Sequence, residues 1–136
     1  DDLACKDVSS KLSEFASVNG GYEAYTTESI ELLFEKSELY DDFSVIYSIE
    51  VNDINEIGIF HSSSEYQAKK LLKEVENYLI DMQENQRAFI ASYAPREVPK
   101  LEKATARKYG NYVIYAILDE GAQESLFDKA QELLKK

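Results

Sequence analysis

The chain has 136 residues and a mass of 15.5 kDa, so we expect residues 1–136 to form a single domain. Hydrophobic residues make up 44% and charged residues 30%, which excludes collagen-like and disordered chains, and no apolar run approaches the roughly 20 residues of a membrane span. Asp and Glu outnumber Lys and Arg by 26 to 15, and the net charge of -11 repels phosphate backbones, so nucleic acid is not an expected partner.

Two amphipathic helices are predicted at the start of the chain. Residues 3–18 repeat apolar side chains every three or four positions, and Asn19 with the two glycines that follow ends this helix. The single cysteine, Cys5, lies on the apolar stripe, so we expect a buried thiol rather than a lipid-modified one. A second helix is predicted over residues 27–36, where Thr27 can cap the N-terminus.

A first pair of strands follows these helices. Apolar and polar residues alternate over 43–51, which predicts a strand with one buried face, and only Ile46 breaks its polar side. A turn at residues 52–53 leads to a second strand over 56–62, and so short a connection predicts an antiparallel hairpin. His61, the single histidine, is expected to lie at the end of this strand without binding a ligand.

A long helix is predicted over residues 64–93, ended by Pro95, and residues 94–101 are predicted to be extended and irregular because they hold both prolines. At 1.5 Å per residue this helix is roughly 45 Å long, which exceeds the roughly 20–27 Å of the strands. We expect the two N-terminal helices to cover the apolar stripe on the excess length, so that the chain is a monomer. The alternative is a dimer in which the overhanging helices pair, with Gln86 as a polar break in the stripe.

A second hairpin and a last helix are predicted for the rest of the chain. Strands over 104–109 and 112–118 flank a two-residue connection, Gly110 and Asn111, of a kind that suits tight hairpins. Nearly every residue of the second of these strands is apolar, which is typical of an interior strand. A helix over residues 119–135 follows.

Together these elements predict an α+β fold. Two N-terminal helices come first, and a strand-strand-helix unit then occurs twice. The simplest arrangement is a four-stranded antiparallel sheet with helices packed on one face. The two units share no residue pattern, so the repeat is one of topology only.

The sequence contains no motif that fixes an activity. One histidine and one cysteine without chelating spacing predict no transition-metal site. The sequence also has no phosphate-binding glycine loop and no nucleophile elbow, so we expect no cofactor and no catalytic residue. Carboxylates are plentiful near the predicted turns, Asp53 and Glu56 among them, and we expect these acids to stay hydrated.

Tyrosine is the one unusual feature of the composition, with 10 residues against 6 Phe and no Trp. Tyr109, Tyr112 and Tyr115 surround the second hairpin turn, and Tyr109 and Tyr112 should be neighbours across the two strands. Tyrosine joins apolar area to a hydrogen-bonding tip, so these three residues are a candidate recognition surface. The alternative is that they simply cover a half-buried sheet, where tyrosine is common.

From Tyr93 onward the chain resembles a bacterial family known as domain of unknown function 4358, and the upstream strand pair, long helix and N-terminal helix fit the family layout, so that the resemblance covers nearly the whole chain. The residues that carry the likeness are Tyr93, the run 95–101 (Pro-Arg-Glu-Val-Pro-Lys-Leu), Ala104 and residues 110–113. Members of this family look like lipoproteins of Gram-positive bacteria. The resemblance therefore implies an extracytoplasmic, membrane-tethered protein whose signal peptide and lipid anchor lie upstream of Asp1 and are absent from this chain; a cytoplasmic relative is the alternative.

We therefore expect a domain that binds or scaffolds without catalysis, with an unknown protein or small ligand at the cell envelope as its partner. One rival is an enzyme that uses surface carboxylates or tyrosines, and acids with a raised pKa inside a cleft would support it. The other rival is a structural spacer, which predicts no cleft and no exposed aromatic patch.

Overall fold

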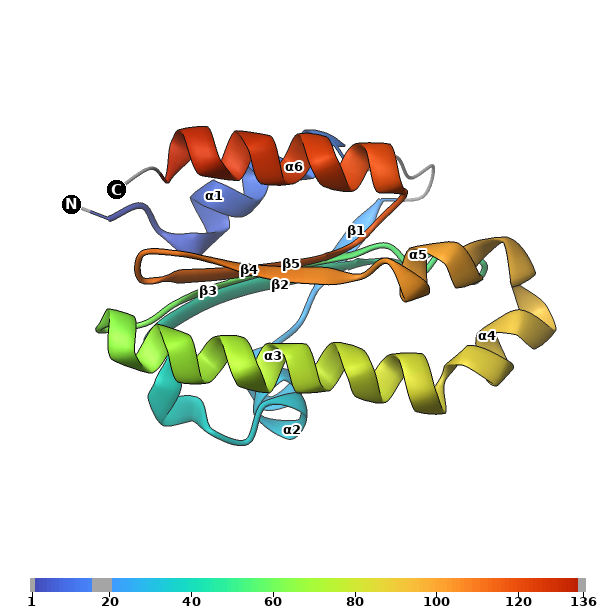
Figure 1. Cartoon of the computed structure of the whole chain (residues 1–136), viewed down its shortest axis with the longest axis horizontal. Helices are drawn as coiled ribbons and strands as arrows, with labels where there is room; N and C mark the ends of the chain where they lie inside the picture. Colours follow the sequence, from blue (N-terminus) through green and yellow to red (C-terminus); the bar gives the residue numbers. More distant parts are fainter. Residues whose placement is uncertain (1, 16–20, 135–136) are drawn as a thin grey trace.

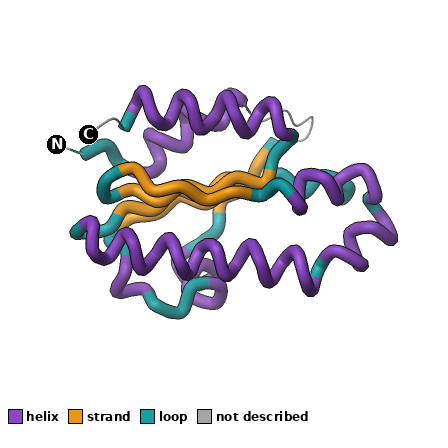
Figure 2. Tube along the Cα trace, viewed as in Figure 1, coloured by secondary structure: helices purple, strands orange, loops and turns teal. Residues whose placement is uncertain are grey.

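A computed structural model describes residues 2–15 and 21–134. These residues form a five-stranded antiparallel sheet with the order β1-β2-β3-β5-β4, between two layers of helices (Figures 1 and 2). The predicted mixed α+β class and antiparallel sheet are confirmed, but the sheet has one strand more than expected. None of the helices in the described part of the chain combines the length and the apolar character that a membrane span requires.

The strands are β1 (Tyr22–Ala24), β2 (Asp42–Ser48), β3 (Glu56–His61), β4 (Thr105–Tyr109) and β5 (Tyr112–Ile117). The helices are α1 (Cys5–Leu12), α2 (Thr27–Leu33), α3 (Glu65–Asn85), α4 (Arg87–Tyr93), α5 (Val98–Glu102) and α6 (Glu120–Leu133). Short 3-10 turns are η1 (Ser13–Phe15), η2 (Ser37–Leu39) and η3 (Pro95–Glu97). The predicted continuation of the first helix to residue 18, and its stop at Asn19, lie outside the described residues.

Helices cover both faces of the sheet, so the expectation that they pack on one face is wrong. In Figure 1, α1 and α6 lie above the sheet and α2 and α3 lie below it. The reason is that the interior strands are apolar in both directions: all six residues of β5 are buried. Both faces of such a strand must be covered. Ile46, which breaks the polar side of β2, packs against the core under α1 and α6.

Two separate cores result, one on each side of the sheet. The core under α1 and α6 includes Cys5, Val8, Leu12, Ile57, Ile59, Ile114, Leu126 and Phe127. The core above α2 and α3 includes Ile30, Phe34, Val45, Phe60, Leu71, Val75, Val113 and Tyr115. Cys5 is fully buried, as predicted, and burial together with the charge of Asp42 raises the pKa of its thiol far above the ordinary value.

The strand that sequence reasoning missed is β1, an edge strand of three residues that pairs with β2. It is too short to show an apolar period, and it follows Gly21, whose φ of +92° favours glycine. The second hairpin is as predicted. β5 lies between β3 and β4, and Gly110 has the positive φ (+62°) that the first position of a type II′ turn requires.

The long helix divides at Gln86 into α3 and α4, and after the non-helical Ala94 the chain forms two more helical segments, η3 and α5. The prediction of an extended segment over 94–101 is therefore wrong. Pro95 and Pro99 stand at the first or second position of a helical segment, where the missing N–H removes no intrahelical hydrogen bond. Only α2 of the two N-terminal helices lies on the side of α3, so α1 does not cover the overhang.

Candidate functional site

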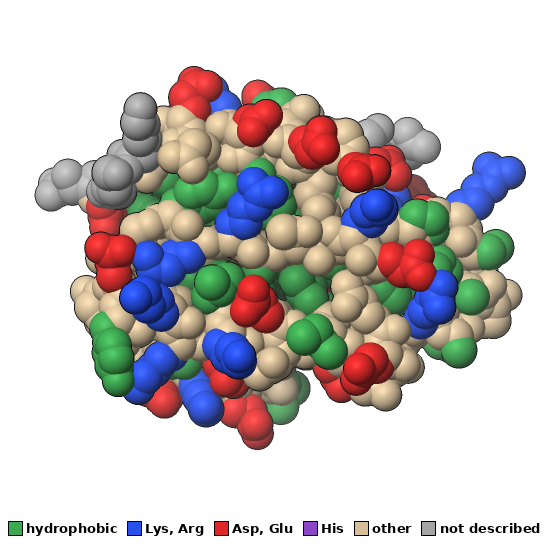
Figure 3. Space-filling model, viewed as in Figure 1, with side chains coloured by type: hydrophobic (Ala, Val, Ile, Leu, Met, Phe, Trp, Pro, Cys, Tyr) green, Lys and Arg blue, Asp and Glu red, His purple; other side chains and the backbone are tan. Residues whose placement is uncertain are grey.

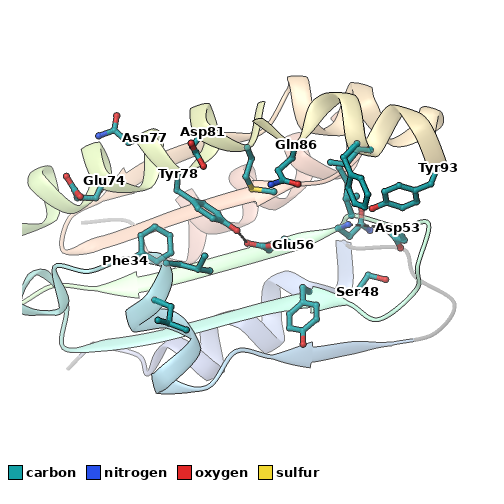
Figure 4. Close-up of a pocket in the computed structure, with 18 residues that line it drawn as sticks. Phe34, Ser48, Asp53, Glu56, Glu74, Asn77, Tyr78, Asp81, Gln86 and Tyr93 are labelled. Atoms are coloured by element: carbon teal, nitrogen blue, oxygen red, sulfur yellow. Dashed lines mark hydrogen bonds between the residues drawn. The ribbon is translucent and has the colours of Figure 1, made fainter. Parts of the chain in front are cut away.

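A cleft of about 670 Å³ opens on the lower face of the sheet. Its walls are α2, the loop between β2 and β3, and the joint where α3 meets α4 (Figure 4). The cleft exists because α2 has only seven residues, so this layer does not close over the sheet beside α4. Thr26, one residue earlier than predicted, caps α2 by accepting a hydrogen bond from the N–H of Ser29 (3.2 Å).

Glu56, the first residue of β3, lies in the floor of the cleft with only 6% of its surface exposed. The Tyr78 hydroxyl, which points from α3 toward Glu56 in Figure 4, donates to its Oε2 (2.8 Å), and the Tyr115 hydroxyl donates to the same oxygen. Within the described residues no donor reaches Oε1. Glu56 therefore presents a desolvated carboxyl group with one oxygen left for a ligand.

Burial and hydrogen bonding act in opposite directions on this carboxyl group. Burial raises the pKa of Glu56, while the hydrogen bonds from Tyr115 and Tyr78 lower it, and burial dominates, so the pKa lies above the ordinary 4.5. Burial, followed by the charge of Glu56, also raises the pKa of Tyr78 and Tyr115 and lifts that of the neighbouring Tyr25 to about 12. The tyrosines therefore remain protonated donors at neutral pH.

The loop between β2 and β3 is held in place by α5 and the turn before it. Glu97 Oε1 accepts hydrogen bonds from the N–H of Ile54 (2.9 Å) and from Lys100 Nζ (2.8 Å), and Lys100 also contacts Asp53 Oδ1 (3.3 Å). Each of the three charged side chains is at most 15% exposed. Asp53 is thus not the hydrated turn residue that we expected. Residues 95–101, which carry the family likeness, fix one rim of the cleft.

Large apolar side chains are exposed on the walls of the cleft. Leu32 is 84% exposed and Leu33 40% on α2, while Phe89 is 64% exposed and Tyr93 41% on α4. The Phe89 and Tyr93 rings contact each other, with centroids 5.0 Å apart. Figure 3 shows hydrophobic side chains at the surface on the end of the molecule formed by α4 and α5. Exposed apolar groups that gather at a cleft are typical of a binding surface.

The cleft is acidic. It is lined by Asp53, Glu56, Glu74 and Asp81, and among the described residues that line it there is no Lys or Arg. Lys100 pairs with Asp53, and Lys36 lies 3.6 Å from Glu74. In the described part of the chain, Glu56 and Asp81 have no basic partner, so the cleft keeps a negative potential.

Residues 20–118 match the model of the family described as domain of unknown function (DUF4358). The chain belongs to this family. No curated protein and no solved structure matches it. The match spans the whole sheet and every residue that lines the cleft, whereas α1 and α6 lie outside it.

The three tyrosines proposed as a recognition surface are buried in this DUF4358 domain. Tyr109 is 8% exposed, Tyr112 1% and Tyr115 0%. Tyr109 and Tyr112 are cross-strand partners, as predicted, and face the core under α1 and α6. Tyr115 points to the opposite face, where it donates to Glu56. Since helices cover both faces, these side chains serve the interior, and their burial contradicts an exposed surface at this hairpin.

His61 closes β3, as predicted, and lies between two carboxylates. Its Nδ1 is 2.7 Å from Asp41 Oδ1 and its Nε2 is 2.6 Å from Asp2 Oδ2. Burial lowers the pKa of His61, but the hydrogen bonds and charges of Asp41 and Asp2 raise it further, so the pKa lies above 6.5. No group of three or more His, Cys, Asp or Glu in the described ranges could hold a metal ion, and the absence of a metal site stays a prediction.

Sequence reasoning missed the role of Glu56 in this DUF4358 domain, although a signal was present. Glu56 shares a strand face with Gly58 and Phe60, because side chains alternate along β3. Phe60 is fully buried, and Glu56 lies four residues before it on the same face of this interior strand. The Glu56 side chain therefore cannot face bulk solvent. Treating the residue as part of a turn hid this alternation.

Proposed function

We propose that this chain is a binding module of an extracytoplasmic, lipid-tethered protein, and that it binds its ligand in the cleft between α2, α3 and α4. The observation that carries the proposal is a cleft with exposed apolar walls around a buried carboxyl group, Glu56. Its volume of about 670 Å³ lies within the range of ligand sites, which are mostly apolar with a few well-placed polar groups.

The cleft argues against the rival of a structural spacer. A spacer was expected to have neither a cleft nor an exposed aromatic patch, and this chain has both, with Phe89 and Tyr93 exposed on the cleft wall. Leaving such groups in water gives a folded domain no benefit of its own, so their presence favours a surface that a ligand covers.

Binding in the cleft can be tested with an isotope-labelled sample and a library of small fragment molecules. Amide shifts in the NMR spectrum should cluster at Tyr78, Phe89 and the loop around Asp53. Leu126 and other residues of α6 should not respond, which provides an internal control on the closed face. Fragment hits confined to α6, or no hits at all, would contradict the proposal.

Support for the location comes from family membership and from the likeness of residues 95–101 to a family whose members look like lipoproteins. The test uses cells that express the protein from its own gene with an epitope tag. Protease added to intact cells should remove the tagged domain, and a palmitate analogue should label the protein. A protected and unlabelled protein would instead place it in the cytoplasm.

An enzyme is the second candidate, because Glu56 has a raised pKa inside a cleft. A carboxyl group of this kind can donate a proton in general acid catalysis. The test is a panel of chromogenic esters, glycosides and phosphate esters. Turnover that disappears in Glu56→Gln would favour the enzyme, and no turnover with any substrate would favour the binding module.

A further inference from the structure

On the basis of the proposed binding function, we propose that the ligand is a segment of a partner protein that presents a Lys or Arg side chain between apolar side chains. The cationic group would pair with the Glu56 carboxylate in the floor, and the apolar neighbours would pack against Leu33 on α2 and Phe89 on α4.

The floor of the cleft favours a cation. Glu56 is 94% buried and offers Oε1, to which no donor of the described residues is bonded, while the tyrosines hold Oε2 and so fix the position of the carboxyl group. A carboxylate in such a desolvated setting interacts with an opposite charge far more strongly than one in water. Neutral and anionic groups would leave this charge uncompensated.

The charge around the floor points the same way. Asp81 lies on the α3 wall and has no basic partner in the described part of the chain, and the net charge of -11 attracts basic ligands over a longer range. An acidic peptide or a nucleic acid would be repelled by the same field.

The walls favour a polypeptide segment over a small organic cation. Leu32 on α2 and Phe89 and Tyr93 on α4 are exposed on different walls of the cleft, with Glu56 in its floor. A chain that crosses the cleft can cover both walls, and Lys and Arg can extend their apolar stems between them while the charged end reaches the floor. Large apolar and aromatic side chains are also what protein interfaces bury at their centres.

The experiment measures the fluorescence anisotropy of short labelled peptides in which one Lys is flanked by Leu and Phe in a Ser/Gly background. Companion peptides carry norleucine or Glu in place of Lys, or Ser in place of Leu and Phe. The Lys peptide should bind, the norleucine peptide should bind about tenfold more weakly, and the Glu peptide should not bind measurably. Unlabelled hexylamine should compete only weakly, because it cannot cover the walls.

Variants of the protein locate the two halves of the interaction. Glu56→Gln should weaken the Lys peptide about tenfold and leave the norleucine peptide unchanged, while Glu124→Gln, the same change at an exposed position of α6, should affect neither. Phe89→Ser should weaken both peptides, whereas Tyr66→Ser, at an equally exposed aromatic residue outside the cleft, should not. If Glu56→Gln fails to fold, Asp81→Asn at the exposed wall must still weaken the Lys peptide selectively.

The outcomes separate this inference from the proposed function. Equal binding of the Lys and norleucine peptides, or hexylamine that binds as tightly as the peptide, would overturn the inference while leaving a binding cleft. If fragments shift the amide signals of the cleft residues but no peptide binds, the inference is again overturned and the proposed binding cleft stands. If neither fragments nor peptides bind in the cleft, the proposed function itself is wrong.

Discussion

The two faces of the sheet are built from the same strands but are covered to different degrees. Above the sheet, α6 and α1 close an apolar core in which Leu12, Ile59 and Leu126 have no exposed surface. Below it, α3 is long but α2 has only seven residues, and a cleft remains beside α4. Buried charge gathers on this open face, at Glu56 and Lys100, where it costs stability unless it is paired.

The two faces thus separate apolar packing from the proposed binding cleft. The closed face carries apolar packing that a domain needs in order to fold. The open face carries a carboxyl group whose burial is not offset by a basic partner in the described residues, and four large apolar side chains are exposed on the walls of its cleft. The region that matches the family model contains the open face and the whole sheet, but neither α1 nor α6.

The largest difference in stability should appear when a leucine is shortened to alanine on each of the two faces. Leu126→Ala creates a cavity in the closed core and should lower the free energy of unfolding by about 2–5 kcal/mol. Leu32→Ala, at a position 84% exposed, should change it by less than about 0.5 kcal/mol. Urea denaturation of both variants measures the contrast, and similar losses would mean that the open face is covered after all.

A second prediction concerns Gly58, where the open face has no room. A Cβ at this position would lie 1.9 Å from Cε2 of Tyr115, whose ring is fully buried and held by its hydrogen bond to Glu56. Gly58→Ala should therefore destabilise the chain by about 2–3 kcal/mol. Gly121→Ala is the matched control, because nothing lies within 4 Å of a Cβ there and the helix α6 should gain about 0.5–1 kcal/mol. If Gly58→Ala unfolds at the same urea concentration as the wild type, the Tyr115 ring can move to make room for the Cβ.

How far the sequence predicts this fold follows from what each segment buries. Both hairpins, the interior position of β5 and the helical stretches on either side of them were predictable, because each has a clear apolar period. The layering was not predicted, although Ile46 and the unbroken apolar run of β5 already indicate that both faces are covered. β1 has three residues and cannot show a period, so pairing with β2 alone defines it.

The candidate site was harder to predict because it depends on contacts between distant segments. Glu56 meets Tyr78 and Tyr115 across 22 and 59 positions of the chain, and the rim of the cleft depends on Lys100 reaching Asp53. Local sequence patterns carry no information about contacts between residues so far apart in the chain. They indicated the turns correctly, and the expectation of hydrated acids at those turns followed from treating each turn in isolation.

A third prediction uses pH to show which form of Glu56 the open face prefers. Because the folded-state pKa lies above the ordinary 4.5, the wild-type domain binds a proton more tightly when folded. The contribution of Glu56 to the stability is therefore fully present below pH 4.5 and is lost as the pH rises through the folded-state pKa. Glu56→Gln, which stays neutral, should gain stability relative to wild type across the same interval. Glu124→Gln serves as the control, and a difference that does not change with pH would contradict the burial of a charge.

The smallest expected effect is at His61, on the side of the sheet covered by α1, where the preferred state is the charged one. A neutral imidazole can donate only one hydrogen bond, whereas the protonated ring donates to both Asp41 and Asp2. Its folded-state pKa is raised above 6.5, so the stabilisation is complete below pH 6.5 and is lost as the pH rises through the folded-state value. The effect should stay below about 1 kcal/mol, because both carboxylates are partly exposed.

Both His61 and Glu56 make the domain less stable as the pH rises, so two further measurements are needed to distinguish their contributions. His61→Gln should remove the loss that begins near pH 6.5 and leave the loss that begins near pH 4.5, and Glu56→Gln should do the reverse. High salt should shrink the His61 contribution, because the partly exposed carboxylates of Asp2 and Asp41 are screened, and should leave that of Glu56 in place, because it arises from burial. If salt leaves the His61 contribution unchanged, the charges around His61 are as inaccessible to solvent as Glu56 in the floor of the cleft. The two faces would then differ only in how completely helices cover them.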